Sequence, residues 1–171
     1  MRPLKLSTRI WQSTFTALTC ATSLTSAQAV EIEPAPKAIS ALLKTTKAFK
    51  KTIQVGGKPV SFFYSKAADG KMDQAVFVEH GLYEPSCTHT WAIGFSVATK
   101  KVTGIHPIEM SCPHAFPTKS EGYLDQYTGK GPADVSKLDS QINVVAKATG
   151  SCKLLTAAVK RSIVAVAQAD K

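Results

Sequence analysis

The chain has 171 residues, with 21 Lys and Arg against 12 Asp and Glu and a formal net charge of +9 at pH 7. The positive charge is carried mostly by scattered lysines. No arginine-rich stretch with interleaved aromatic residues occurs, so the composition argues against nucleic-acid binding. A basic chain of this kind favours anionic ligands or acidic partners through long-range electrostatic steering.

Residues 1–29 have the three parts of a secretory signal peptide. A basic start is followed by residues 10–24, which are uncharged and mildly apolar, and residues 26–29, Ser-Ala-Gln-Ala, end in a small-x-small cleavage pattern. The basic residues are Arg2, Lys5 and Arg9. The apolar run is shorter and more polar than a membrane-spanning helix requires.

Cys20 offers an alternative, a lipoprotein anchor, but Leu18 and Thr19 before it are a poor context for lipidation. We therefore predict cleavage near Ala29 and a periplasmic or otherwise exported protein, soluble after cleavage, with one domain over residues 30–171. Three cysteines remain in that domain, which allows at most one disulfide and leaves one thiol. They are Cys87, Cys112 and Cys152.

After a proline-rich lead, apolar residues recur near the helical period over residues 37–53, with lysines on the opposite face. The apolar positions are Ile39, Leu42, Leu43, Phe49 and Ile53. This pattern predicts one amphipathic helix near the N-terminus of the domain. The pair Gly56-Gly57 is expected to end it.

Four strand-like segments follow the predicted helix. They cover residues 59–65, 74–79, 91–97 and 102–110. In the third segment apolar residues alternate with others, which is the period of a half-buried strand and places Trp91 and Phe95 in the core. A short polar link joins the last two segments, so we predict a hairpin within an antiparallel sheet. Pro107 predicts that the last strand lies at an edge or carries a bulge.

The C-terminal part of the chain is predicted to be mostly helical. A Pro-rich passage, residues 111–122, is irregular and long enough to line a binding site. We expect a short helix over residues 121–127, a turn over 134–138, a last strand over 142–145 and a helix from about Cys152. The predicted fold is therefore α+β, a small antiparallel sheet with an N-terminal amphipathic helix and a C-terminal helix that follows a Thr-Gly-Ser turn.

That turn, Thr149-Gly150-Ser151, is a candidate anion site. The first turn of a helix presents unpaired N–H groups and the positive end of the helix dipole, so a phosphate is a suitable ligand. The alternative is a simple helix cap, in which Ser151 accepts a hydrogen bond from a backbone N–H two or three residues further on.

The stretch from Gly104 to Ala165 resembles the FMN-binding domain family, which includes the periplasmic flavin subunits of sodium-pumping quinone reductases and related electron-transfer complexes. A strand GIHPIEM and the Pro-rich loop precede YLDQYTGK, which is similar to the family's FL-x-QF-x-GK element, and KLDSQIN leads to VVAKATGSCKLLTAAVKRSI. Ala148 and Thr149 match the Ala-Thr pair of the family's small-Gly-Ala-Thr signature, and Ser151 matches the hydroxyl that follows it.

This resemblance implies FMN as the cofactor, with its phosphate at the turn and its ring toward the Pro-rich loop. The binding residues that it implies are Lys147, Ala148, Thr149, Gly150, Ser151 and His114. Lys147 could give the phosphate a charge-assisted hydrogen bond. Membrane or periplasmic redox proteins are the expected partners.

The family resemblance also bears on how FMN is attached. In covalently flavinylated members a dedicated transferase joins the Thr hydroxyl to the flavin phosphate. Their signature carries Asp, then Ser or Thr, and Gly where this chain has Asn143, Ala146 and Lys147. We therefore predict that FMN binds non-covalently, and a flavin transferase stays open as a further partner.

Two Cys-x-His pairs flank the predicted hairpin, Cys87 with His89 and Cys112 with His114. Because a hairpin brings its two ends together, these four side chains could converge. Three interpretations remain open. They are a Cys87–Cys112 disulfide, a metal site built from all four side chains, and free thiols near a flavin.

No Ser-His-Asp arrangement or paired acid and base motif is evident in the sequence, so no catalytic residue is predicted. We expect an exported FMN-binding protein that acts as an electron-transfer carrier or subunit rather than as a stand-alone catalyst. The alternative hypothesis, from another class, is an exported metal-binding or sensory module that uses the Cys and His cluster.

Overall fold

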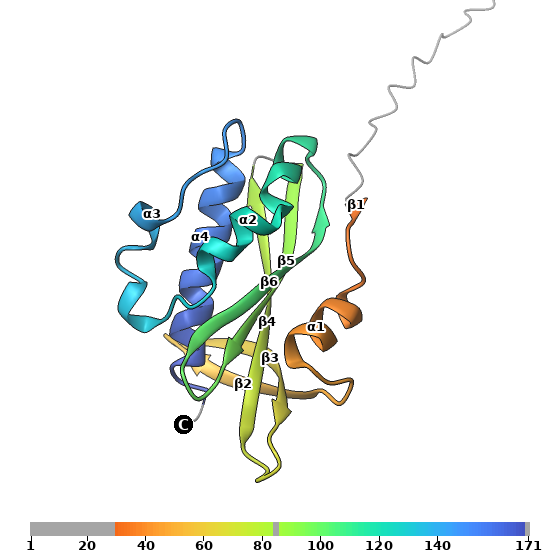
Figure 1. The fold of residues 1–171 in the computed structure, drawn as a ribbon, viewed down its shortest axis with the longest axis vertical. Coiled ribbons are helices and arrows are strands. Elements are labelled where there is room, and N and C mark those ends of the chain that lie inside the picture. Colours follow the sequence, from red (N-terminus) through yellow and green to blue (C-terminus); the bar gives the residue numbers. More distant parts are fainter. Residues whose placement is uncertain (1–29, 84–85, 170–171) are drawn as a thin grey trace, which may run out of the picture.

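The computed structural model describes residues 30–83 and 86–169, and its centre is an antiparallel β-sheet (Figure 1). The strands lie in the order β1-β6-β5-β4-β3-β2, so all neighbours except β1 and β6 are consecutive in the chain. Their bounds are Val30–Glu31 (β1), Phe49–Val55 (β2), Lys58–Lys66 (β3), Met72–Tyr83 (β4), Cys87–Ser96 (β5) and Lys101–Met110 (β6). The predicted signal peptide, residues 1–29, lies outside the described residues.

Helices cover both faces of the sheet, with α1 on one face and α4 on the other (Figure 1). The α-helices are Ala35–Leu43 (α1), Glu121–Leu124 (α2), Leu138–Gln141 (α3) and Thr149–Val166 (α4), and the 3-10 helices are Pro113–Lys119 (η1), Asp125–Tyr127 (η2) and Pro132–Asp134 (η3). The α+β class, the antiparallel sheet and its two flanking helices are thus confirmed. Within the described residues, no helix has the length and apolar character needed to cross a membrane.

Strand β5 lies at the centre of the core. Trp91, Ile93 and Phe95 have no exposed surface, and they pack with α4 in the larger hydrophobic cluster. Ala92 points to the opposite face and belongs to the smaller cluster with Leu42 of α1. The alternation predicted from the sequence is confirmed, because successive strand residues face opposite sides of the sheet.

The helix predicted over residues 37–53 is wrong in its second half. Helix α1 ends at Leu43, and Lys44 takes the left-handed conformation, with φ 56°, that ends many helices. Phe49 and Ile53, four residues apart, fit a helical period and a strand period equally well. Both lie on the partly buried face of β2, which pairs along its whole length with β3.

The glycine pair at the end of β2 is a hairpin turn rather than a helix stop. Gly56 and Gly57 have φ values of 58° and 78°. They connect Val55 to Lys58, which face each other as the first pair of the β2–β3 ladder. A two-residue turn with two positive φ values matches the twist of the strands on either side, and glycine reaches this conformation without strain.

Pro107 lies at a bulge in β6. Its Cα partner in β5 is Trp91, whereas the preceding residue of β5, Thr90, pairs with Glu109. Ile108 is therefore the extra residue of the bulged strand. This confirms the prediction from proline, which cannot donate a ladder hydrogen bond.

The strand predicted over residues 142–145 is absent, and that segment has no regular structure. Ile142 is buried, but Val144 keeps 57% of its surface exposed. None of the strands that the structure describes pairs with this segment. Helix α4 begins at Thr149 rather than near Cys152. The Thr-Gly-Ser triplet is consequently the first turn of the helix, and not a turn that precedes it.

A buried chain of hydroxyls ties the short helices to α4. The Tyr123 hydroxyl lies 2.9 Å from that of Tyr127, which lies 2.8 Å from Oγ1 of Thr156 on α4. Thr156 in turn donates to the carbonyl of Cys152 at 3.0 Å. Burial raises the pKa of both tyrosines, so both stay protonated.

Replacing Tyr127 with Phe is expected to lower the free energy of unfolding by about 1–3 kcal/mol. The change removes the hydroxyl that joins Tyr123 to Thr156, so both of these buried hydroxyls lose a hydrogen-bond partner. Urea denaturation would measure the loss. Tyr64→Phe is the control, since that hydroxyl has no hydrogen bond within the described residues, and it should change stability little. Equal effects of the two substitutions would contradict a role for the hydroxyl chain.

Candidate functional site

A cavity of about 400 Å³ lies at the N-terminal end of α4. Its walls come from the first turn of α4, the end of β4, the start of β5 and the beginning of η1, which meet at one end of the molecule (Figure 1). The lining residues are Tyr83, Ser86, Cys87, Cys112, His114, Lys147, Ala148, Thr149, Gly150 and Ser151. The set contains all six binding residues that the sequence predicts, although His114 lies more than thirty residues away from the other five in the chain.

The first turn of α4 has no side-chain cap. Ala148 is the N-cap residue, and its carbonyl accepts the first hydrogen bond of the helix, from the N–H of Cys152 at 3.0 Å. Helix geometry leaves the N–H groups of Thr149, Gly150 and Ser151 without an intrahelical partner. These three donors and the positive end of the helix dipole therefore stand at the cavity wall, where an anion would satisfy them.

Ser151 does not cap the helix, which corrects the alternative interpretation of the turn. Its Oγ lies 2.9 Å from Nε2 of His89 on β5, and both side chains are buried. The His89 ring stacks on Trp91, with ring centroids 5.2 Å apart. Burial lowers the pKa of His89 below its ordinary value, so the ring is neutral near pH 7.

Lys147 has a backbone conformation that favours glycine. Its φ is 64°, in the left-handed region. The strain of a lysine in this conformation is modest for a single residue. Lys147 is exposed and lines the cavity next to the uncapped helix turn.

Gly150 is packed closely by an aromatic ring that sequence reasoning missed. A Cβ at this position would lie 2.6 Å from Cε2 and Cζ of Tyr83, so only glycine lets the ring rest on the helix. Tyr83 keeps 46% of its surface exposed. It is the aromatic residue at the site, whereas Trp91 and Phe95 are fully buried and line no part of the cavity.

The Cys87–Cys112 disulfide is confirmed, and it forms part of the cavity wall. Because the two sulfurs are bonded to each other, neither is available as a metal-binding thiolate. Within residues 30–83 and 86–169, no group of three or more His, Cys, Asp or Glu side chains is arranged to hold a metal ion. Cys152 is a free, buried thiol whose Sγ accepts a hydrogen bond from the N–H of Val145 at 3.3 Å.

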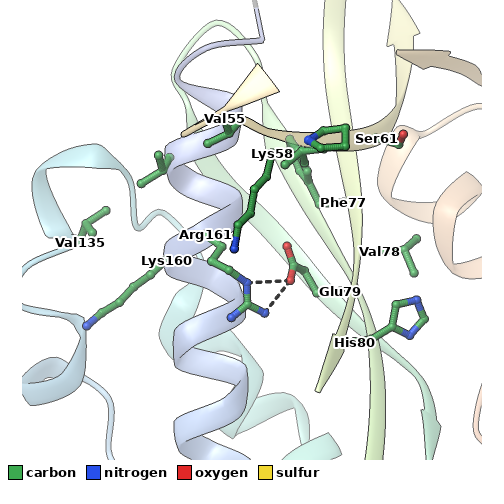
Figure 2. Close-up of a pocket in the computed structure, with 13 residues that line it drawn as sticks. Val55, Lys58, Ser61, Phe77, Val78, Glu79, His80, Val135, Lys160 and Arg161 are labelled. Atoms are coloured by element: carbon green, nitrogen blue, oxygen red, sulfur yellow. Dashed lines mark hydrogen bonds and ion pairs between the residues drawn. The ribbon is translucent and has the colours of Figure 1, made fainter. Parts of the chain in front are cut away.

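A larger cavity of about 750 Å³ lies elsewhere, between α4, β4 and the start of β3. It forms because the β3–β4 ladder stops at Val76, so the two strands diverge beyond that point. Figure 2 shows the Arg161 guanidinium directed at the Glu79 carboxylate, which it contacts at 3.2 and 2.7 Å. Glu79 also accepts a hydrogen bond from Ser162 at 3.1 Å. Arg161 and Glu79 therefore neutralise each other as an ion pair within this cavity. None of the predicted site residues lines it.

No family model, curated protein or solved structure matches this chain. Ser151 and His89 form a hydroxyl–imidazole pair, but Nδ1 of His89 has no hydrogen-bond partner within the described residues. Among the described residues, no Asp or Glu side chain is hydrogen-bonded to His89 as the third member of a Ser-His-Asp triad would be. The arrangement is suited to holding an anion beside an aromatic ring and a disulfide.

Proposed function

We propose that this chain is an exported FMN-binding protein that transfers electrons, and that it holds the flavin phosphate non-covalently at the N-terminus of α4. The observation that carries the proposal is the convergence of all six predicted binding residues on one cavity. A volume of about 400 Å³ is within the range of small-molecule pockets, roughly 300–1,000 Å³. FMN would supply one-electron and hydride-equivalent chemistry, and the protein would bind and orient it.

The phosphate would meet three kinds of donor. These are the uncapped N–H groups of the first turn of α4, the exposed hydroxyl of Thr149 and the ammonium of Lys147. Among the described residues that line the cavity there is no carboxylate to repel it. The ring would extend toward His114 and Tyr83, where the cavity wall is aromatic.

Contacts among the elements that resemble the FMN-binding family also support the proposal. Gln126 of the YLDQYTGK element holds the backbone of Asn143, accepting from its N–H at 2.7 Å and donating to its carbonyl at 3.3 Å. Lys130 donates to Gln141 at 3.0 Å. These bonds fix the segment that leads into the first turn of α4, so elements matched separately in the sequence form one continuous structure.

Export and redox partners are part of the same proposal. The Cys87–Cys112 disulfide is compatible with an oxidising compartment outside the cytosol. Membrane or periplasmic redox proteins would supply and accept the electrons. Because Asn143, Ala146 and Lys147 depart from the signature of covalently flavinylated members, acid precipitation of the loaded protein is expected to leave FMN in the supernatant.

Replacing Thr149 with Val is expected to weaken FMN binding about tenfold, because it removes one hydrogen bond to the phosphate and keeps the shape of the side chain. Titration of flavin fluorescence would measure the affinity. Thr99→Val makes the same chemical change at an exposed turn distant in sequence from the cavity, and it should have no effect. Unchanged affinity in Thr149→Val would leave Thr149 no role in binding phosphate.

A further inference from the structure

The two sulfurs of the disulfide differ in their access to the cavity. Cys87 begins β5 and is 6% exposed, whereas Cys112 follows β6 and is only partly buried. Both line the cavity at the N-terminus of α4. A thiol that enters this cavity would therefore reach the sulfur of Cys112 more easily than that of Cys87.

The less accessible sulfur has a polar partner. Nε2 of His89 lies 4.0 Å from Sγ of Cys87 and 2.9 Å from Oγ of Ser151, which belongs to the first turn of α4. His89 is 1% exposed, and its other ring nitrogen, Nδ1, has no hydrogen-bond partner within the described residues. A buried polar atom without a hydrogen-bond partner is unusual in a folded protein, because its desolvation lowers stability, so packing alone does not explain a histidine at this position.

We propose that the Cys87–Cys112 disulfide exchanges with external thiols, with Cys112 as the attacked sulfur and Cys87 as the leaving group. This inference goes beyond FMN binding and does not depend on it. The geometry gives each sulfur one role, since Cys112 is the more exposed of the two cysteines that line the cavity and Cys87 lies beside an imidazole that can donate a hydrogen bond to a thiolate.

The exchange is balanced with a dithiol as the reductant. Its first sulfur, as a thiolate, bonds to Sγ of Cys112 while the Cys112–Cys87 bond breaks, and the electron pair leaves on Sγ of Cys87. Its second sulfur then attacks the first, which releases Cys112 as a thiolate and closes the external disulfide. The dithiol is oxidised, the protein disulfide is reduced, and the two protons of the dithiol end on Cys87 and Cys112.

The charges around the disulfide favour the approach of an external thiolate. The positive end of α4 lies at the same cavity, which Lys147 also lines, and a helix N-terminus and a nearby lysine both stabilise thiolates. Among the described residues of the cavity wall there is no Asp or Glu that would repel an incoming thiolate. The partner that suits this exchange is a protein or small molecule that carries a reactive dithiol and occurs in the compartment to which the chain is exported.

Brief exposure of the oxidised protein to glutathione, followed by acid quenching, alkylation and peptide mapping, tests the assignment of the two sulfurs. We expect glutathione on Cys112 and the alkyl group on Cys87. Glutathione mainly on Cys87, or no mixed disulfide at all, would overturn the proposal. This experiment uses the unaltered protein without added flavin, so its result is independent of FMN binding.

The rate of disulfide reduction by dithiothreitol tests the role of His89. His89→Phe keeps a ring that can stack on Trp91 but removes the nitrogen near Cys87, and it should slow reduction about tenfold. His80→Phe is the matched control, because His80 bonds Thr90 on the same strand pair and does not contact the disulfide. Equal rates in His89→Phe and the unaltered protein would contradict the role of His89.

Discussion

Replacing Lys147 with Glu is expected to weaken FMN binding about 100-fold, a loss of about 3 kcal/mol. The substitution removes a charge-assisted hydrogen bond to the phosphate, worth about 1.5–3 kcal/mol, and places a negative charge beside it. The uncapped N–H groups of α4 would remain, so binding should be weakened rather than abolished. Isothermal titration of the unaltered protein and the variant would measure the difference.

Two further variants isolate the cause of that loss. Lys153→Glu makes the same change of net charge at an exposed position on α4 that does not line the cavity, so affinity should fall little. Lys147→Gly removes the charge and relieves the positive φ, so it should lose affinity while keeping or gaining stability. Equal losses in Lys147→Glu and Lys153→Glu would show that only the overall charge of the protein matters.

The second large effect is expected from the disulfide. The Cys87→Ala/Cys112→Ala double variant should lose about 3 kcal/mol of unfolding free energy, because the bond joins residues separated by 25 positions and restricts the unfolded chain. It also holds the start of η1 against β5, where His114 lines the cavity. Urea denaturation would measure the loss.

Chemical reduction is the control for that double variant. The unaltered protein, unfolded in the presence of a phosphine reductant, should be destabilised by a similar amount, since both treatments remove the same cross-link. A loss below about 1 kcal/mol in both cases would mean that the disulfide has little structural role. That result would leave thiol exchange as the main reason why the Cys87–Cys112 disulfide lies in the cavity wall.

Much of the fold follows from local sequence pattern, and the failures have a physical cause. The alternation around Trp91 and the long apolar face of α4 each fit one period, so strand and helix were predicted correctly. Phe49 and Ile53 fit both periods, and only the pairing of β2 with β3 selects the strand. The β-branched pair near Val144 suggested a strand, but none of the strands in the described part of the chain pairs with it.

The candidate site was predictable where its residues are continuous in the chain. Lys147 to Ser151 form one short segment that a resemblance can identify. The contact between Ser151 and His89 joins residues 62 positions apart, and the close packing of Tyr83 on Gly150 depends on where β4 ends. No local pattern encodes such contacts, since they arise only when α4 packs across the sheet.

If the first turn of α4 binds the phosphate of FMN, the protein should distinguish FMN from riboflavin, which has the same ring and no phosphate. Titration of the purified protein should show one FMN bound per chain, with an affinity about 100-fold higher than that for riboflavin, because the charged contacts are made to the phosphate. Equal affinities for the two flavins, or no binding of either, would contradict a phosphate site at the first turn of α4.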